Sequence, residues 1–195
     1  SKILANTKKG KLPKTVNINI NSLDGINNNG KTLIHYNIYS PTKLSKYLKS
    51  TKWAPSKNAF IKALAKKITK GKKTDYEKAE AIFNWLNKQT NYSFYYNSKY
   101  GAIKTIKLKK GNCVDISHAY TAIARSIGLP TRYIHGKCTF KSGKPKRTGH
   151  VWVQVLVNKV WIPVDLSNLK NRFGAIVSWN PYTYKKYSVL SKTPW

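Results

Sequence analysis

Acidic side chains are scarce in this chain of 195 residues, where six Asp and Glu stand against 37 Lys and Arg. The formal net charge at pH 7 is therefore +31. A surface of this composition attracts polyanions. We expect an anionic polymer among the partners, although the lysine excess can equally serve solubility alone.

Arginine is rare as well, with four residues in the whole chain: Arg125, Arg132, Arg147 and Arg172. Lysine supports charge attraction better than the bidentate contacts with which arginine reads bases. The chain also lacks a helix-turn-helix, zinc-finger or RNP pattern. We therefore expect no specific nucleic-acid partner, and a basic nucleic-acid- or polyanion-binding module stays open only as an alternative function.

No apolar run is long enough to span a bilayer, and no signal-peptide pattern opens the chain. Two cysteines do not make a disulfide framework and indicate a reducing or anoxic setting. Methionine is absent, the first residue is Ser1, and no internal repeat is found. We expect a soluble, monomeric, excised domain with a single core and no membrane insertion.

One of the two cysteines opens a predicted helix. Asn112 is a favoured N-cap residue, and apolar residues follow at helical spacing until Gly128-Leu129-Pro130 ends the pattern. Cys113 then occupies the first helical position, where orphan N–H groups and the helix dipole favour a thiolate. Asp115 is interpreted as a helix-start residue, whose replacement by Asn is expected to cost less than about 1 kcal/mol.

A hairpin pattern follows in residues 150–165. Apolar residues alternate on both sides of Asn158-Lys159, which predicts two strands joined by a two-residue turn. In this register Val157 pairs with Val160, and His150 and Asp165 become diagonal neighbours on one face, roughly 7 to 8 Å apart at the backbone. The opposite face is predicted to be core.

Each of these residues has an ordinary structural explanation. A lone Cys is more often a small core residue, a strand His is usually a satisfied polar residue, and an Asp at a strand end is usually a turn former. Their combination instead favours a nucleophile, its base and an orienting acid in the order Cys113, His150, Asp165. The other histidines have no metal-site spacing, and Cys138 is predicted to be a core residue.

Four segments together resemble the transglutaminase-like superfamily of cysteine enzymes over about Thr74 to Asp165. They are Gly-Asn-Cys-Val-Asp at 111–115, Arg-Ser-Ile-Gly-Leu-Pro-Thr-Arg-Tyr at 125–133, Gly-His-Val-Trp-Val-Gln-Val at 149–155 and Trp-Ile-Pro-Val-Asp at 161–165. The resemblance implies an α+β, transglutaminase-like or papain-like cysteine-enzyme fold, with the catalytic helix packed on an antiparallel sheet.

Within that superfamily the chain is similar to the pseudomurein endoisopeptidases of viruses and proviruses of methanogenic archaea. The similarity implies cleavage of the isopeptide bond between alanine and the lysine ε-amine in the archaeal cell wall, with wall lysis as the result. Cys113, His150 and Asp165 fall on the catalytic positions of that family. It also implies an enzyme made in the host cytoplasm that meets the wall from inside, where no signal peptide is needed. Wall-binding repeats of that family are not found in this chain.

The expected domains are an N-terminal β-hairpin extension at 1–50 and the catalytic domain at 51–195, together one compact unit. The hairpin strands are predicted at Thr15–Asn21 and Leu33–Tyr39, joined by a polar loop around residues 24–30. Asp24 in that loop is a candidate ligand for a cation such as calcium, which the resemblance makes worth considering. The chemistry itself requires no cofactor. Amphipathic helices are predicted at Ser56–Thr69 and Thr74–Gln89, the second with a capping box.

Aromatic residues crowd the segment Asn91–Asn97. Asn97 is a candidate partner of the Cys113 backbone N–H in an oxyanion hole. Tyr96 and Trp152 are candidate substrate-binding residues, with core packing as the alternative for each. Hydrolysis and acyl transfer to an amine would use the same three catalytic residues, so the sequence leaves both reactions open.

Overall fold

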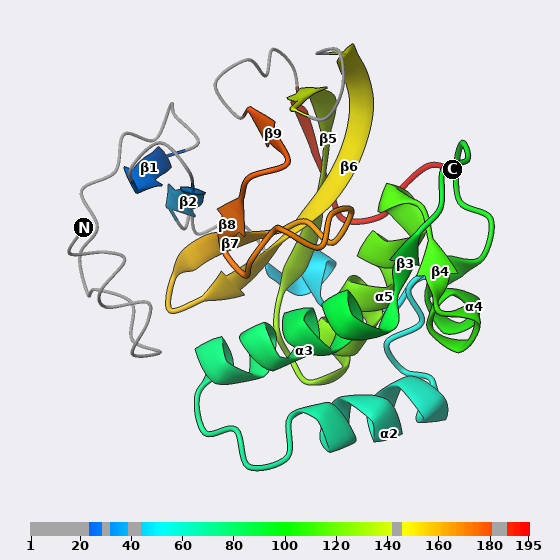
Figure 1. Cartoon of the computed structure of the whole chain (residues 1–195). Coiled ribbons are helices and arrows are strands. Elements are labelled where there is room, and N and C mark those ends of the chain that lie inside the picture. Colours follow the sequence, from blue (N-terminus) through cyan, green and yellow to red (C-terminus); the bar gives the residue numbers. More distant parts are fainter. Residues whose placement is uncertain (1–23, 29–31, 39–43, 142–145, 181–186) are drawn as a thin grey trace.

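The computed structural model describes residues 24–28, 32–38, 44–141, 146–180 and 187–195. Within them the fold is α+β, with the α-helices gathered on one side of a long antiparallel sheet (Figure 1). The helices are the 3-10 helix η1 (Leu44–Tyr47), α2 (Ala59–Ile68), α3 (Asp75–Gln89), α4 (Gly101–Leu108) and α5 (Cys113–Ser126). No helix in these described ranges combines the length and the apolarity that a membrane crossing requires.

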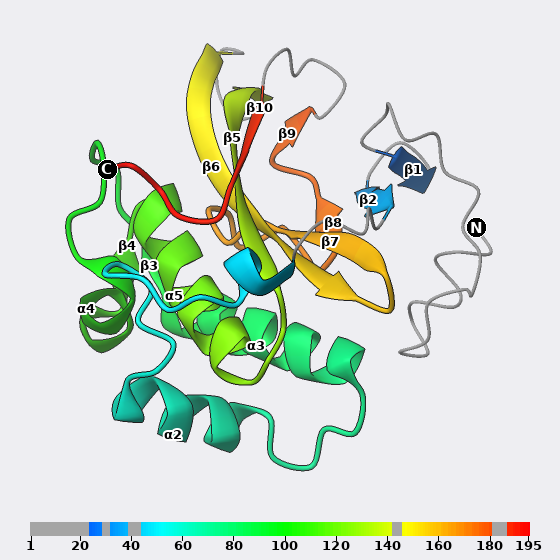
Figure 2. The ribbon, with the colours of Figure 1, turned by 180° about the vertical axis from the view of Figure 1, so that it is seen from behind.

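The main sheet follows the order β1-β2-β7-β6-β5-β10, and its pairs are antiparallel. Its strands are β1 (Asp24–Asn28), β2 (Thr32–Ile38), β5 (Thr131–Phe140), β6 (Lys146–Val157), β7 (Val160–Val164) and β10 (Tyr187–Leu190). Two short strands join it, with β8 (Ala175–Ile176) on β2 and β9 (Trp179–Asn180) on β5. A separate parallel pair, β3 (Asn91–Tyr92) and β4 (Lys110–Gly111), lies beside α4 (Figure 2).

The β6–β7 hairpin has the predicted register, with Val157 opposite Val160 and Val153 opposite Val164. Asn158 and Lys159 both have positive φ, at 51° and 65°, as a two-residue type I′ turn requires. The apolar stripe on the face opposite His150 and Asp165 is buried throughout: Val151, Val153, Val155, Val157, Val160, Ile162 and Val164. Those residues belong to the main core, which packs against this face of the hairpin.

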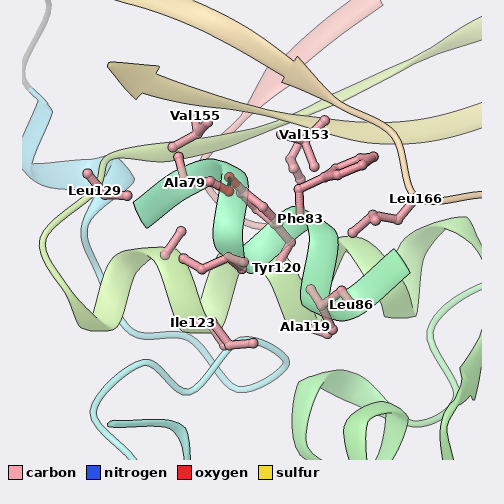
Figure 3. Packing of buried hydrophobic residues seen from close by; sticks show 14 of the residues in the cluster. Ala79, Phe83, Leu86, Ala119, Tyr120, Ile123, Leu129, Val153, Val155 and Leu166 are labelled. Atoms are coloured by element: carbon pink, nitrogen blue, oxygen red, sulfur yellow. Dashed lines mark hydrogen bonds between the residues drawn. The ribbon is translucent and has the colours of Figure 1, made fainter. Parts of the chain in front are cut away.

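Helix α5 runs through the centre of that core. Figure 3 shows Phe83 and Leu86 of α3 beside Tyr120 of α5, with Val153 and Val155 of β6 above them. The tyrosine is fully buried and its hydroxyl donates to the carbonyl of Ala79 at 3.1 Å. Because α5 is held by the sheet and by α3, its first residue has a fixed position relative to the strands.

Helix and hairpin predictions fared differently. The capping box of α3 is confirmed, with the Thr74 hydroxyl accepting from the Glu77 N–H and the Glu77 carboxylate accepting from the Thr74 N–H. The polar loop predicted around 24–30 is wrong for residues 24–28, which form β1 and pair with β2. The strand predicted at Thr15–Asn21 lies outside the described residues. The remaining hairpin strand, β2, joins the main sheet through its pairing with β7.

Candidate active site

Cys113 lies where the sequence places it, as the first residue of α5 after the N-cap Asn112. The Asn112 side chain accepts a hydrogen bond from the Asp115 N–H at 2.9 Å, which fixes the first helical turn. Neither cysteine forms a disulfide, and Cys113 is half-buried whereas Cys138 is fully buried in β5. Only the first of the two thiols is therefore placed to meet a substrate.

His150 of β6 and Asp165 after β7 form a buried pair. His150 Nε2 and Asp165 Oδ2 are 2.8 Å apart, and the two side chains are 3% and 1% exposed. Since the carboxylate occupies Nε2, Nδ1 is the ring nitrogen left for the thiol. The hairpin register thus brings together the two residues that sequence analysis placed on one face.

Opposing effects act on the pKa values of this pair. Burial alone would lower the pKa of His150, but the charge of Asp165 and hydrogen bonds to Asp165 and Cys113 raise it well above its ordinary value. Burial alone would raise the pKa of Asp165, but the His150 charge and hydrogen bonds lower it. Both shifts favour the ionised forms, so the imidazolium and the carboxylate stabilise each other.

Two further donors hold the Asp165 carboxylate. The Trp179 indole N–H of β9 donates to Oδ2 at 2.7 Å, and the Ser167 backbone N–H donates to Oδ1 at 2.9 Å. Asn171 donates its amide to the Asp165 carbonyl at 3.1 Å. The Asp165 carboxylate therefore has a fixed orientation, and it fixes the orientation of the His150 imidazole.

Trp152 does not line the cavity beside Cys113, contrary to its interpretation as a substrate-binding residue. It is 1% exposed and packs behind the imidazole, with ring centroids 5.8 Å from His150 and 4.8 Å from Trp179. The reason is that β9, which lies beyond the hairpin in sequence, pairs with β5 and brings the Trp179 ring onto the Trp152 indole.

Cys113 and His150 face one cavity of about 690 Å³. Its lining is largely aromatic or small and polar: Tyr92, Phe94, Tyr95, Tyr96, Asn97, Asn112, Val114, His135, Phe140, Thr148, Gly149, Val151, Ser167, Asn168 and Trp195. No Lys, Arg, Asp or Glu of the described residues is among them. Apart from Cys113 and the two histidines, the lining of this cavity is therefore uncharged, although the chain has a net charge of +31.

Tyr96 and Asn97 both lie at this cavity, as sequence analysis placed them. Tyr96 is 83% exposed, so its ring is available to a ligand. Asn97 has a left-handed backbone, with φ of 60°, and its carbonyl accepts from the Asn112 side-chain amide at 2.9 Å. Its contact with the residue before Cys113 is therefore made by the main chain, and the oxyanion role of its side chain stays a prediction.

Asp115 is more than the helix-start residue that the sequence indicates. It is 0% exposed, and its carboxylate accepts from the Tyr95 hydroxyl and from three consecutive backbone N–H groups, at residues 99–101. The small stability cost expected for Asp115→Asn is therefore wrong, because that figure applies to an exposed acid near a helix dipole. No local pattern around Asp115 reveals these partners, because they lie 14 to 20 residues away in the chain.

Two histidines outside the predicted triad have distinct positions. His135 of β5 lines the cavity, and burial followed by the charge of His150 lowers its pKa. His118 is buried inside α5, with Nε2 2.8 Å from the Ser98 hydroxyl and Nδ1 2.8 Å from the Tyr133 hydroxyl. Burial lowers the pKa of His118 to about 4. Alternation along the strands could not have indicated this position, because His135 lies opposite Val151, whose side chain is on the other face from His150.

No group of three or more His, Cys, Asp and Glu side chains in the described part of the chain is placed to hold a metal ion. Asp24 lies in β1, opposite Tyr36 of β2, rather than in the loop where a cation ligand was expected. A role for calcium therefore stays a prediction from the resemblance alone.

Solved structures show similarity to this fold. A putative cysteine protease from Cytophaga hutchinsonii matches with a TM-score of 0.57 and 20% identity, covering 87% of this chain and 59% of that one. This chain thus spans less than two thirds of that protein. The periplasmic domain of TgpA from Pseudomonas aeruginosa matches with a TM-score of 0.49 and 17% identity, over 66% of this chain and 49% of that domain. No curated protein matches the sequence.

The family comparison covers the residues that build the site. The family model of the transglutaminase-like superfamily matches residues 62–166, from α2 to the end of the β6–β7 hairpin. This range includes Cys113, His150 and Asp165, and it takes in more than half of the chain. The chain therefore belongs to the transglutaminase-like superfamily.

Proposed function

We propose that this protein is a cysteine endoisopeptidase that hydrolyses the bond between an alanyl group and a lysine ε-amine in archaeal pseudomurein. The observation that carries the proposal is the meeting of Cys113 with the His150–Asp165 ion pair at one cavity, whose other lining residues are largely aromatic or small and polar. A thiol at a helix start, a positioned imidazole and an orienting carboxylate are the parts that acyl transfer through cysteine requires.

Acylation begins with Cys113 as the thiolate and His150 as the imidazolium. The Cys113 thiolate attacks the alanyl carbonyl, and the oxyanion is stabilised by N–H groups of the first turn of α5. The His150 imidazolium donates its Nδ1 proton to the lysine ε-nitrogen as the carbon–nitrogen bond breaks. The products of this half are a thioester on Cys113 and a free amine.

Deacylation uses the same groups in reverse. Neutral His150 takes a proton from water, the resulting hydroxide attacks the thioester, and the Cys113 thiolate leaves as alanine's carboxylate is released. Asp165 stays ionised throughout and stabilises the imidazolium whenever it forms. Its hydrogen bonds from Trp179 and Ser167 keep that charge in place during both halves.

The cavity fits an uncharged acyl group carried by an aliphatic amine. Alanine brings no charge that would need a counterion, and the lysine methylenes can pack against the aromatic rings of Phe94, Tyr96 and Phe140. The basic surface outside the cavity would hold an anionic wall polymer nearby. The segments around Cys113 and His150 that resemble pseudomurein endoisopeptidases add to this reading.

A transglutaminase is the second candidate, because the same thioester could be taken by an amine in place of water. The specific observation in its favour is the family itself. The Cytophaga hutchinsonii protein of similar fold is described as a putative cysteine protease, and this supports hydrolysis instead. The partition of the thioester between water and amine decides between the two reactions.

The test is mass spectrometry of methanogen wall peptides, and of a synthetic alanyl-ε-lysine peptide, after incubation with the protein. Loss of the bond with uptake of one water supports the proposal, and Cys113→Ala should abolish it. An amide adduct formed with added amine would instead identify a transglutaminase. An intact bond with both substrates would overturn the proposed substrate class.

A further inference from the structure

We propose that Asp115 is the positioning residue that holds the aromatic loop, residues Tyr92–Tyr100, against Cys113, so that this loop can serve as the acyl-binding wall of the cavity. The proposal rests on cysteine chemistry at Cys113, which is part of the proposed function, but not on which substrate is cleaved. Asp115 acts through the loop and touches no reacting atom.

The Asp115 carboxylate is the anchor of the loop's C-terminal end. Oδ2 accepts from the Tyr95 hydroxyl at 2.6 Å and from the Lys99 and Tyr100 N–H groups at 3.0 Å. Oδ1 accepts from the Gly101 N–H at 2.8 Å. These N–H groups open α4, whose N-cap Tyr100 offers no side-chain acceptor. Asp115 therefore caps a second helix from inside the first.

Tyr95 carries the connection back to the nucleophile. Its hydroxyl donates to Asp115 and accepts from the Asn112 backbone N–H at 3.0 Å. The Asn112 side-chain amide donates to the carbonyls of Tyr95 and Asn97 at 2.9 Å each. Asn112 and Asp115, which lie on either side of Cys113 in the chain, thus both hydrogen-bond to the same loop.

The gripped loop points its other rings at the cavity. Phe94 and Tyr96, on either side of Tyr95, are 68% and 83% exposed and stand with ring centroids 5.3 Å apart. Both line the cavity with Cys113. Rings so exposed have few contacts to fix them, so their place relative to the thiol depends on the backbone that Tyr95 and Asp115 hold.

A carboxylate is the side chain that this position needs. Four donors converge on its two oxygens, and a carboxylate accepts at both while an amide must present one N–H₂ group to incoming donors. Asp115→Asn keeps the size of the side chain but turns at least one of these contacts from attractive to repulsive. The loop then loses its fixed place while Cys113 keeps its helix.

Two measurements test the proposal on Asp115→Asn. With the alanyl-ε-lysine peptide, KM should rise about tenfold while kcat changes less than about threefold. The substrate loses its contacts with the aromatic loop, whereas Cys113 keeps its position at the start of α5. Iodoacetamide should modify Cys113 of Asp115→Asn at a rate within about threefold of the wild-type rate, with the same pH profile. N-benzyl iodoacetamide should modify the variant about tenfold more slowly than the wild type, because its ring depends on the aromatic loop. The matched control is Asp75→Asn, an exposed first-turn acid of α3 that should change neither.

A merely structural role for Asp115 predicts a different pattern. A smaller folded fraction lowers kcat and both alkylation rates together and leaves KM unchanged, and that result would overturn the proposal. If Asp115→Asn does not fold, Tyr95→Phe decides, since it removes only the bridging hydroxyl: a rise in KM with an unchanged iodoacetamide profile supports the proposal, and unchanged behaviour with both reagents overturns it. Because the alkylation arm needs no peptide, failure of the proposed substrate is seen separately.

Discussion

Two buried carboxylates flank the candidate nucleophile, and they differ in what balances their charge. Asp165 faces an imidazolium and an indole N–H, whereas Asp115 faces a phenol and three backbone N–H groups. One counter-charge can move when His150 gives up its proton; the other consists of fixed dipoles. Two of the six acidic residues in the chain are therefore buried. The comparison separates an acid that serves the reaction from one that shapes the site.

The largest expected effect is on the reactive side of the comparison. Asp165→Ala should keep the fold and lower turnover by about 10³ to 10⁴, because the imidazolium of His150 loses the charge that stabilises it. The measurement is cleavage of the alanyl-ε-lysine peptide, with circular dichroism to verify folding. Near-normal turnover in a folded Asp165→Ala protein would place the acid of the triad on another residue.

The next effect is on stability and belongs to the other carboxylate. Asp115→Ala leaves the Tyr95 hydroxyl and three backbone N–H groups without their acceptor, and should lower the free energy of unfolding by about 3 to 5 kcal/mol. Urea denaturation measures this change. Asp75→Ala, at an exposed acid of α3, should cost no more than about 0.5 kcal/mol. Equal losses in the two variants would show that Asp115 does not hold the aromatic loop in place.

Two buried histidines extend the comparison to pH. Burial lowers the pKa of His118 from 6.5 to about 4, so its contribution to stability is complete above pH 6.5 and is lost as the pH falls toward 4. The loss should reach about 3 kcal/mol in the free energy of unfolding. His150 has the opposite sign: its raised pKa gives stability below pH 6.5 that is lost as the pH rises through that pKa.

Urea unfolding between pH 4 and 7 measures the His118 term. In His118→Gln the fall in stability over this range should become smaller by about the same 3 kcal/mol, since the glutamine does not titrate. An identical pH dependence in the wild type and the variant would assign the acid sensitivity to other groups.

The smallest effect concerns the orientation of Asp165. Trp179→Phe removes the indole donor to Oδ2 and keeps an aromatic ring in the cluster behind His150. Loss of a hydrogen bond to a charged acceptor should raise the activation free energy by about 2 kcal/mol, which appears as slower turnover with KM little changed. A change in KM alone would mean that Trp179 serves binding rather than the ion pair.

Local signals in the sequence predicted much of this site. The N-cap at Asn112, the capping box of α3 and the turn at Asn158-Lys159 each depend on residues within a few positions of one another. From them the helix start of Cys113 and the strand register of the hairpin follow. The α+β fold with a catalytic helix on an antiparallel sheet, which the family resemblance implied, is confirmed as well.

Long-range contacts account for what the sequence did not reveal. Asp115 looks like an ordinary helix-start acid until the loop at 95–101 folds onto it, and α4 was not predicted because its N-terminal cap comes from another helix. Trp152 looks like a cavity residue until the Trp179 ring packs on it. In each case the deciding partner lies more than ten residues away, where no periodic pattern reports it.

The two-residue turn at Asn158-Lys159 imposes a counting rule on how this chain can vary. His150 and Asp165 meet because an even number of residues separates them across the turn, as successive side chains in a strand point to opposite sides. A single inserted or deleted residue between them would turn the Asp165 side chain to the other face of the sheet, among the buried valines. Length changes there can survive only in pairs or with a compensating bulge, whereas the same changes beyond Asp165 carry no such penalty on the pair.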